Sequence, residues 1–182
     1  MRIISGKNRG THLLGYDIDG IRPTMDKVKE SVFAIINSKL NNSICLDLFS
    51  GTGSLGLEAL SNNARCCYFV DEMNKAIEIT KSNIEKTKNM DNSIIIKNNY
   101  VEALKILSKR DIKFDIIFVD PPYGKIKIKE VINNIIKYDI LSIDGIIICE
   151  YECEDLEDNY EYLTLNKEKK YGNTYVRIYK KE

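Results

Sequence analysis

Short apolar runs alternate along the chain with segments of helical periodicity, and this alternation constrains the fold more than any other feature. The apolar runs lie at residues 44–48, 66–70, 94–97, 114–119 and 145–149. Between them, helical spacing of apolar side chains extends over residues 55–60, 74–88, 101–107 and 131–136. Because the runs are apolar at nearly every position, both of their faces must be buried. The pattern predicts an α/β fold in which helices cover both faces of a mostly parallel sheet.

The second half of the chain ends in a different pattern. Residues 162–165 and 174–179 alternate between apolar and polar side chains on either side of Tyr171-Gly172-Asn173. This alternation predicts an antiparallel hairpin at one edge of the sheet, which brings the expected number of strands to seven. Residues 150–161 carry seven acidic and no basic side chains. We expect a solvated loop or a frayed helix there.

The first forty residues precede the alternating pattern. Thr24 is expected to cap a helix whose apolar face is formed by Val28, Val32, Ile35 and Ile36. Residues 1–14 contain Arg2, Lys7, Arg9 and His12 but no acid, and they predict a small basic β-hairpin. No repeat or linker divides the chain, so we expect a single domain over residues 1–182. Within it, residues 1–40 form the hairpin and helix, and residues 41–182 form a Rossmann-like core.

Composition and charge exclude several functional classes. Lysine and arginine number 27, as do aspartate and glutamate, so the zero net charge argues against a general polyanion binder. No apolar run approaches the ~20 residues of a membrane span, and the first residues lack a signal-peptide pattern. We therefore expect a cytoplasmic protein with no membrane contact. The five cysteines contain no CxxC pair and His12 is the single histidine, so we expect no metal site.

A glycine-rich loop follows the first apolar run, and Gly51, Gly53 and Gly56 in it have the spacing GxGxxG. Asp71 ends the second run, where an acidic side chain typically binds a ribose hydroxyl. These features suit a nicotinamide dinucleotide or another adenosine-containing cofactor. Asp47 stands at the mouth of the loop, where it would repel a pyrophosphate and attract the ammonium and sulfonium groups of S-adenosylmethionine. The loop favours S-adenosylmethionine over a dinucleotide, and Gly56 alone could simply allow close helix–strand packing.

The fourth apolar run leads directly into Asp120-Pro121-Pro122-Tyr123. The prolines remove two N–H donors, so the Asp120 carboxylate and the Pro121 carbonyl form an acceptor surface beside an aromatic ring. This surface can hold the two N–H groups of an exocyclic amine on a stacked base. Two acceptors also localise the lone pair of the amine and stabilise the positive charge that develops during methylation. The motif predicts amino-methylation rather than a simple turn, and it suits guanine N2 and adenine N6 equally.

Together, the two motifs resemble those of S-adenosylmethionine-dependent amino-methyltransferases with a (D/N)PP(Y/F) catalytic motif. The resemblance narrows to the RsmD-type 16S rRNA (guanine-N2)-methyltransferases. Their N-terminal signatures are similar to Met1-Arg2-Ile3-Ile4-Ser5-Gly6 and to Arg22-Pro23-Thr24-Met25-Asp26-Lys27-Val28-Lys29-Glu30, an RPTxDxxxE segment. Lys170-Tyr171-Gly172-Asn173-Thr174 also follows that family. The match covers nearly the whole chain and implies the class I methyltransferase fold.

The resemblance implies a role for each motif residue. Cofactor-binding positions would be Asp47, Phe49, Gly51, Gly53, Asp71 and Asn99. Among them, Asp71 would bind the ribose and Asn99 the adenine amine, although a helix cap is an equally good interpretation of Asn99. Catalytic positions would be Asp120, Pro121 and Tyr123, which would hold the N2 amine of a guanine swung out of the RNA stack.

The implied substrate is 16S rRNA within an assembling small ribosomal subunit, and we expect the enzyme to act as a monomer. Phosphate contacts are expected from Arg2, Lys7, Arg9, Arg22 and Lys125, with Lys127 and Lys129 as further candidates.

Three alternative functions stay open. The main alternative is an N6-adenine methyltransferase of RNA or DNA, although the chain leaves no room for a DNA-recognition domain. A non-catalytic ribosome-assembly factor is disfavoured by the intact motif at residues 120–123. An NAD-dependent oxidoreductase is disfavoured by Asp47.

Overall fold

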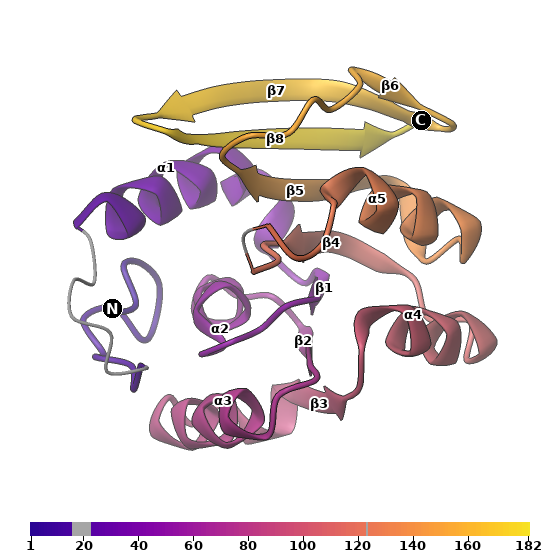
Figure 1. Ribbon diagram of the computed structural model, residues 1–182. Coiled ribbons are helices and arrows are strands. Elements are labelled where there is room, and N and C mark those ends of the chain that lie inside the picture. Colours follow the sequence, from indigo (N-terminus) through magenta and orange to yellow (C-terminus); the bar gives the residue numbers. More distant parts are fainter. Residues whose placement is uncertain (16–22, 123) are drawn as a thin grey trace.

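A single mixed sheet with helices on both faces organises the protein (Figure 1). The computed structural model describes residues 1–15, 23–122 and 124–182. Its helices are α1 (Pro23–Leu40), α2 (Ser54–Ser61), α3 (Asn74–Lys86), α4 (Tyr100–Lys109) and α5 (Ile128–Lys137), with a 3-10 turn at Met90–Asn92. Its strands are β1 (Ile44–Asp47), β2 (Cys66–Asp71), β3 (Ser93–Lys97), β4 (Phe114–Val119), β5 (Leu141–Tyr151), β6 (Asn159–Tyr160), β7 (Leu163–Tyr171) and β8 (Thr174–Lys181).

The strands follow the spatial order β3-β2-β1-β4-β5-β8-β7-β6. Neighbours from β3 to β5 run parallel, whereas β8, β7 and β6 add to β5 in antiparallel pairs. The order reverses between β1 and β4. Ligands of doubly wound sheets bind at such a reversal, outside the carboxyl ends of the strands. The topology therefore predicts a ligand-binding site at the carboxyl ends of β1 and β4.

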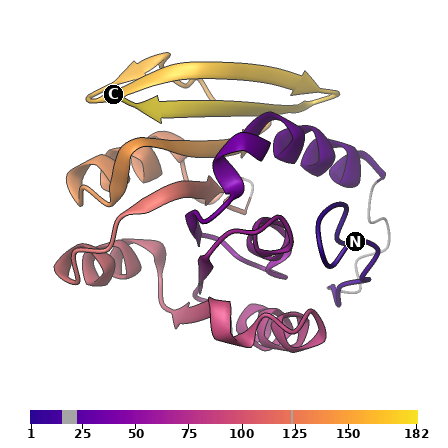
Figure 2. The same cartoon turned by 180° about the vertical axis from the view of Figure 1, so that it is seen from behind.

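Two apolar clusters fill the space on the two faces of the sheet. One face is covered by α1, α2 and α3, and its core includes Val32, Leu57, Ile84 and Phe118. The opposite face is covered by α4 and α5, with Leu104, Val131 and Ile117 in its core. The views from front and back show these two helix layers on either side of the sheet (Figures 1 and 2). The predicted arrangement of helices on both faces is confirmed.

The sheet has one strand more than the predicted seven. The additional strand, β6, has two residues and pairs with Leu163 and Thr164 at the outer edge of β7. Also, β5 begins at Leu141, before the predicted run, and it ends at Tyr151. A register shift between Phe114 and Ile116 of β4 accommodates this longer strand.

The small β-hairpin predicted in residues 1–14 is reduced to one antiparallel bridge. An isolated bridge between Arg2 and His12 closes a loop there, in place of a ladder. Backbone hydrogen bonds from Ile3 N to Thr11 O and from Gly10 N to Ile3 O hold the loop together. Helix α1 begins at Pro23, which places Thr24 inside the first turn and not at the cap.

The predicted solvated loop in residues 150–161 is confirmed for the centre of the segment and not for its ends. Its first residues belong to β5, and its centre is an ordered loop. Arg177 of β8 donates from Nη1 to the Leu156 carbonyl, and the hydroxyl of Tyr179 donates to the Glu157 carbonyl at 2.7 Å.

Within the described residues, no helix combines the length and the apolarity that crossing a bilayer requires.

Candidate active site

The glycine loop connects the end of β1 to the start of α2. Gly51 and Gly53 have φ angles of 54° and 77°, values that favour glycine. The N–H of Gly53 donates to the Ser50 carbonyl at 2.6 Å, which closes the turn just before α2. Gly56 lies in the first turns of α2, and a Cβ there would lie 2.3 Å from Cε1 of Phe69. The third glycine of the motif therefore serves packing, whereas the first two shape the loop.

Asp47 and Asp71 support this loop from the ends of β1 and β2. Asp47 is 2% exposed, and the Gly56 N–H donates to its Oδ2 at 3.0 Å. Burial raises the pKa of Asp47 to about 7, because this single hydrogen bond does not compensate the loss of solvation. Asp71 accepts bonds of 2.9 Å from the N–H groups of Gly51 and Met73. Asp71 thus fixes the loop directly, and each of its oxygens keeps a lone pair for a ligand hydroxyl.

Two aromatic rings form a wall next to these carboxylates. The rings of Phe49 and Tyr100 lie with their centroids 5.5 Å apart. Asn99, directly before Tyr100, caps α4: its side-chain oxygen accepts a bond of 3.0 Å from the N–H of Glu102. The helix-cap interpretation of Asn99 is therefore correct, and the residue also faces the cavity described below. Tyr100 was missed in the sequence, although an aromatic residue at the start of a helix after a strand is a usable signal.

The proline motif follows β4 without an intervening residue. Asp120 and Pro122 face the cavity, whereas Pro121 is buried and is not part of the cavity wall. Burial raises the pKa of Asp120 well above its usual range, and the charges of Glu150 and Asp47 raise it further. Tyr123 lies outside the described residues.

Glu150 is the functional candidate that sequence reasoning missed. It was grouped with the acidic segment, but it lies in β5, where it pairs with Val176 of β8. Its side chain lines the same cavity as Asp120. Glu150 could have been predicted from its position directly after the fifth apolar run, because polar residues at strand ends face the ligand crevice.

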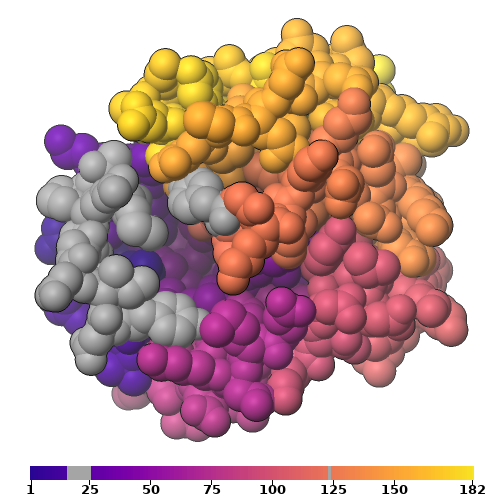
Figure 3. All heavy atoms as spheres, in the orientation of Figure 1, coloured from indigo at the N-terminus to yellow at the C-terminus, as the bar shows by residue number. Residues whose placement is uncertain are grey.

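A cavity of about 540 Å³ joins these groups. In the space-filling view the surface is hollowed between the orange segment after β4 and the magenta segment at the end of β2 (Figure 3). Among the predicted site residues, the cavity wall contains Asp47, Phe49, Gly51, Asp71, Asn99 and Asp120. Gly53 is not in the wall, and a Cβ at this position would lie 3.2 Å from Cγ2 of Thr80. A second part of the wall is apolar and consists of Val28, Val32, Phe118, Ile148 and Val176.

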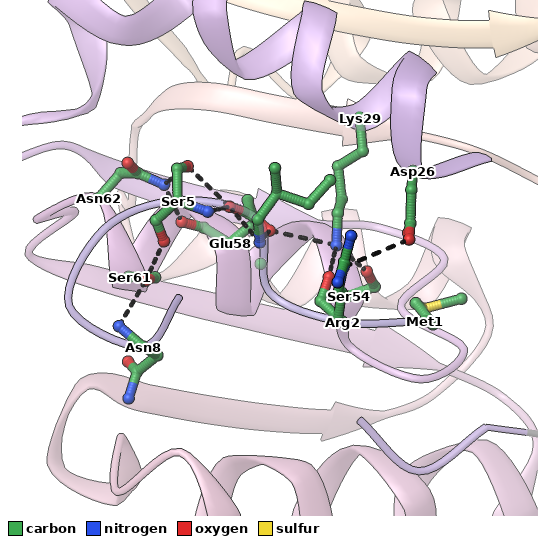
Figure 4. Close-up of polar contacts among 12 residues, drawn as sticks. Met1, Arg2, Ser5, Asn8, Asp26, Lys29, Ser54, Glu58, Ser61 and Asn62 are labelled. Carbon is green, nitrogen blue, oxygen red and sulfur yellow. Dashed lines mark hydrogen bonds and ion pairs between the residues drawn. The ribbon is translucent and has the colours of Figure 1, made fainter. Parts of the chain in front are cut away.

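The N-terminal loop is fastened beside this cavity by a buried ion pair (Figure 4). Nζ of Lys29 in α1 lies 3.1 Å from Oε2 of Glu58 in α2, and the two side chains are 6% and 0% exposed. Glu58 also accepts bonds from the N–H groups of Ile4 and Ser5, at 2.9 Å and 2.8 Å. Lys29 donates to the Arg2 carbonyl at 2.6 Å. The ion pair thus ties three segments together, and it places Met1 in the cavity wall.

The predicted phosphate-binding side chains lie on the surface. Arg2, Lys7, Arg9 and Lys125 are exposed, and Nε of Arg2 lies 4.0 Å from Oδ2 of Asp26. Lys129 forms an exposed ion pair with Glu157. Arg22 lies outside the described residues.

Comparisons with known proteins agree on one group of relatives. The family model described as conserved hypothetical protein 95 matches residues 1–180. A Bacillus subtilis protein named "Putative rRNA methyltransferase YlbH" is 40% identical, over 100% of this chain and 99% of its own length. Ribosomal RNA small subunit methyltransferase D of Escherichia coli is 33% identical, over 100% of this chain and 90% of its own.

The fold agrees with a solved structure of comparable length. The structure of "Putative methyltransferase yhhF" from Escherichia coli superposes with a TM-score of 0.88 and is 31% identical. The match covers 100% of this chain and 98% of that chain.

Proposed function

The chain belongs to the family of conserved hypothetical protein 95, together with ribosomal RNA small subunit methyltransferase D, and we propose its function from this premise. It methylates the exocyclic N2 amine of a guanine in small-subunit ribosomal RNA, with S-adenosylmethionine as the methyl donor. One observation carries the proposal: a glycine loop with its carboxylates and a proline-flanked Asp120 face a single cavity at the ends of β1 and β4.

The residues of the glycine-loop side fit S-adenosylmethionine. The Asp71 carboxylate suits the ribose hydroxyls, and the Phe49 and Tyr100 rings suit the face of an adenine. The buried Asp47 carboxylate lacks a cation among its hydrogen-bond partners named above, so a ligand with positive charge complements it and a pyrophosphate does not. Bound there, the cofactor supplies a methyl carbon that is electrophilic because it is attached to a sulfonium.

Asp120 would hold the target amine. Its carboxylate lies at the end of β4, at the boundary between the cofactor side and the apolar recess. As an acceptor it orients the amine N–H groups and stabilises the positive charge that develops on nitrogen. The Tyr123 ring is proposed as the stacking surface. The Pro121 carbonyl is proposed as the second acceptor on the sequence motif alone, since Pro121 is not part of the cavity wall.

The substrate would reach the site as part of a small ribosomal subunit. The exposed Arg2, Lys7, Arg9 and Lys125 are proposed to contact phosphates that flank the flipped base. We further propose one catalytic domain over residues 1–182, because the family model spans almost the same residues. The proposal includes a cytoplasmic location and a monomeric state.

Transfer of labelled methyl groups tests this function. Small subunits from a strain lacking the protein are incubated with tritiated-methyl S-adenosylmethionine, and the RNA is digested to nucleosides. We expect label in N2-methylguanosine. Label in N6-methyladenosine, or none at all, would contradict the proposed reaction.

A variant of Asp120 tests the assignment of the catalytic carboxylate. Asp120→Ala is expected to lower the transfer rate at least about 100-fold, because the amine loses its charged acceptor, while S-adenosylhomocysteine binding measured by calorimetry persists. The control is Asp91→Ala, in the exposed 3-10 turn, which should transfer like the unmodified protein. Loss of cofactor binding together with transfer would refute the separation of the two roles.

A further inference from the structure

A second carboxylate lies beside Asp120 at the same end of the sheet. Val119 of β4 pairs with Cys149 of β5, so the residues that follow them, Asp120 and Glu150, are neighbours across the two parallel strands. Both line the cavity. Side chains alternate along a strand, so Asp120 and Glu150 share the face of Phe118 and Ile148, two positions earlier.

The space beneath the two carboxylates is apolar. Val28 and Val32 of α1 face Phe118, Ile148 and Val176 of the sheet, and all five belong to the cavity wall. Each is buried. A flat aromatic base suits such a recess, with its polar edge directed to the carboxylates and its faces against the aliphatic side chains. The recess is continuous with the cofactor side of the cavity, since a single cavity contains both.

Two adjacent carboxylates favour a ligand edge with two adjacent donors. Burial raises the pKa of Asp120, and the charge of the adjacent Glu150 raises it further, because close acids repel each other. The Watson–Crick edge of guanine presents N1–H and the N2 amine side by side, whereas the corresponding edge of adenine presents N1 as an acceptor beside the N6 amine. Adenine would set a lone pair against one of the two acids.

On the basis of the proposed function, we propose that Glu150 selects guanine: its carboxylate accepts the N1–H while Asp120 holds the N2 amine. The catalytic motif alone suits guanine N2 and adenine N6 equally, so the discrimination must come from another residue. Glu150 occupies the adjacent strand position from which the neighbouring ring atom can be reached. An adenine in this place would bind only if Glu150 took up a proton. Glu150 is therefore the specificity determinant, and Asp120 is the catalytic contact.

Replacement of the target guanine by a base that lacks the N1–H, and that carries an amine in place of O6, tests the proposal. The methylated guanosine is first located, and small subunits are then assembled with 2,6-diaminopurine riboside at that position. This base keeps the N2 amine but has an acceptor at N1. The unmodified protein should transfer to it about 10- to 100-fold more slowly than to guanine, the usual effect of losing one hydrogen bond to a charged group. In Glu150→Gln, whose amide can donate as well as accept, this ratio should fall to less than about 3-fold.

Glu152→Gln serves as the matched control, because Glu152 lies two residues further on and is not part of the cavity wall. It should keep the ratio of the unmodified protein. Equal transfer to both bases by the unmodified protein, or an unchanged ratio in Glu150→Gln with S-adenosylhomocysteine binding intact, would overturn the proposal. The first of these comparisons needs no variant, so a failure of Glu150→Gln to fold leaves the test in place. A lack of label on the guanine-containing subunits would instead refute the proposed function itself, and the inference with it.

Discussion

Asp47 illustrates how a single residue links the binding site to the stability of the protein. Its carboxylate is buried at the end of β1 and receives one N–H, from Gly56. Burial raises its pKa from 3.8 to about 7, and the charge of Asp71 contributes in the same direction. The folded protein therefore keeps a proton on Asp47 at pH values where the unfolded chain has already released it.

This difference predicts a pH dependence of stability with a definite sign. From pH 4 to 7 the folded state binds more protons at this residue than the unfolded state, so the free energy of unfolding falls as pH rises through the raised pKa of about 7. In Asp47→Asn the decrease of the free energy of unfolding with pH should be smaller by a few kcal/mol, because the variant lacks the group whose pKa is raised. Urea denaturation at pH 4 to 8 measures it, with the exposed Asp91→Asn as control. The same slope in Asp47→Asn and in the unmodified protein would refute the assignment.

At the scale of elements, the sequence was most informative where both faces of a strand are buried. The apolar run at residues 114–119 coincides with β4, since every residue of it except Asp115 is buried. Ends of elements were less predictable. β5 extends to Tyr151 because β8, distant in sequence, supplies hydrogen-bond partners as far as Tyr175. That pairing converts Glu150 from a member of an acidic loop into a side chain of the cavity.

The candidate site was also predictable only in part. The cavity position of Asp47, Gly51, Asp71 and Asp120 was predictable, because loops at the ends of parallel strands β1, β2 and β4 converge on one crevice. The position of Glu150 depends on strand pairing, and that of Lys29 on the packing of α1 against α2. The contact of Lys29 with Glu58 has no local signature in the sequence, whereas the place of Glu150 directly after the fifth apolar run was a usable one.

The loop after β5 has an identifiable role in the start of α5. Glu154 accepts hydrogen bonds of 3.0 Å from the N–H groups of Ile128 and Lys129, so it caps the helix from a distant segment. Glu154→Ala should lower the free energy of unfolding by about 1 to 2 kcal/mol, because two helix N–H groups lose their acceptor and the negative charge leaves the helix N-terminus.

Chemical denaturation of Glu154→Ala at neutral pH measures this loss. Glu161→Ala is a suitable comparison, because Glu161 is an exposed acid in the same acidic segment. Equal stability of the two variants would show that the cap is unimportant.

At the scale of the whole molecule, the exposed cations of the N-terminal loop lie on the side of the sheet that carries α2. The loop is anchored there by Glu58 and Lys29, so its surface has a fixed position relative to the cavity. Salt-dependent RNA binding through this surface follows from the proposed function, because each neutralised phosphate releases counterions.

Charge reversal at Arg9 should therefore weaken binding to small subunits. It should also reduce the slope of log affinity against log salt concentration by about 1 to 2. Filter binding at several salt concentrations measures both quantities. Lys109→Glu is the control, because Lys109 is exposed at the end of α4, on the opposite face of the sheet. If Arg9→Glu and Lys109→Glu reduce the affinity equally, the N-terminal loop has no special part in recognition.

The cavity is lined by residues from Met1 to Val176, so segments from almost the whole chain must come together to form it. Contacts of such high sequence separation cost entropy, because the intervening loops must be closed. A chain whose β8 has not yet paired with β5 lacks Val176 beside Glu150, and with it one side of the recess. Binding of a ligand in the recess therefore requires that β8 has paired with β5.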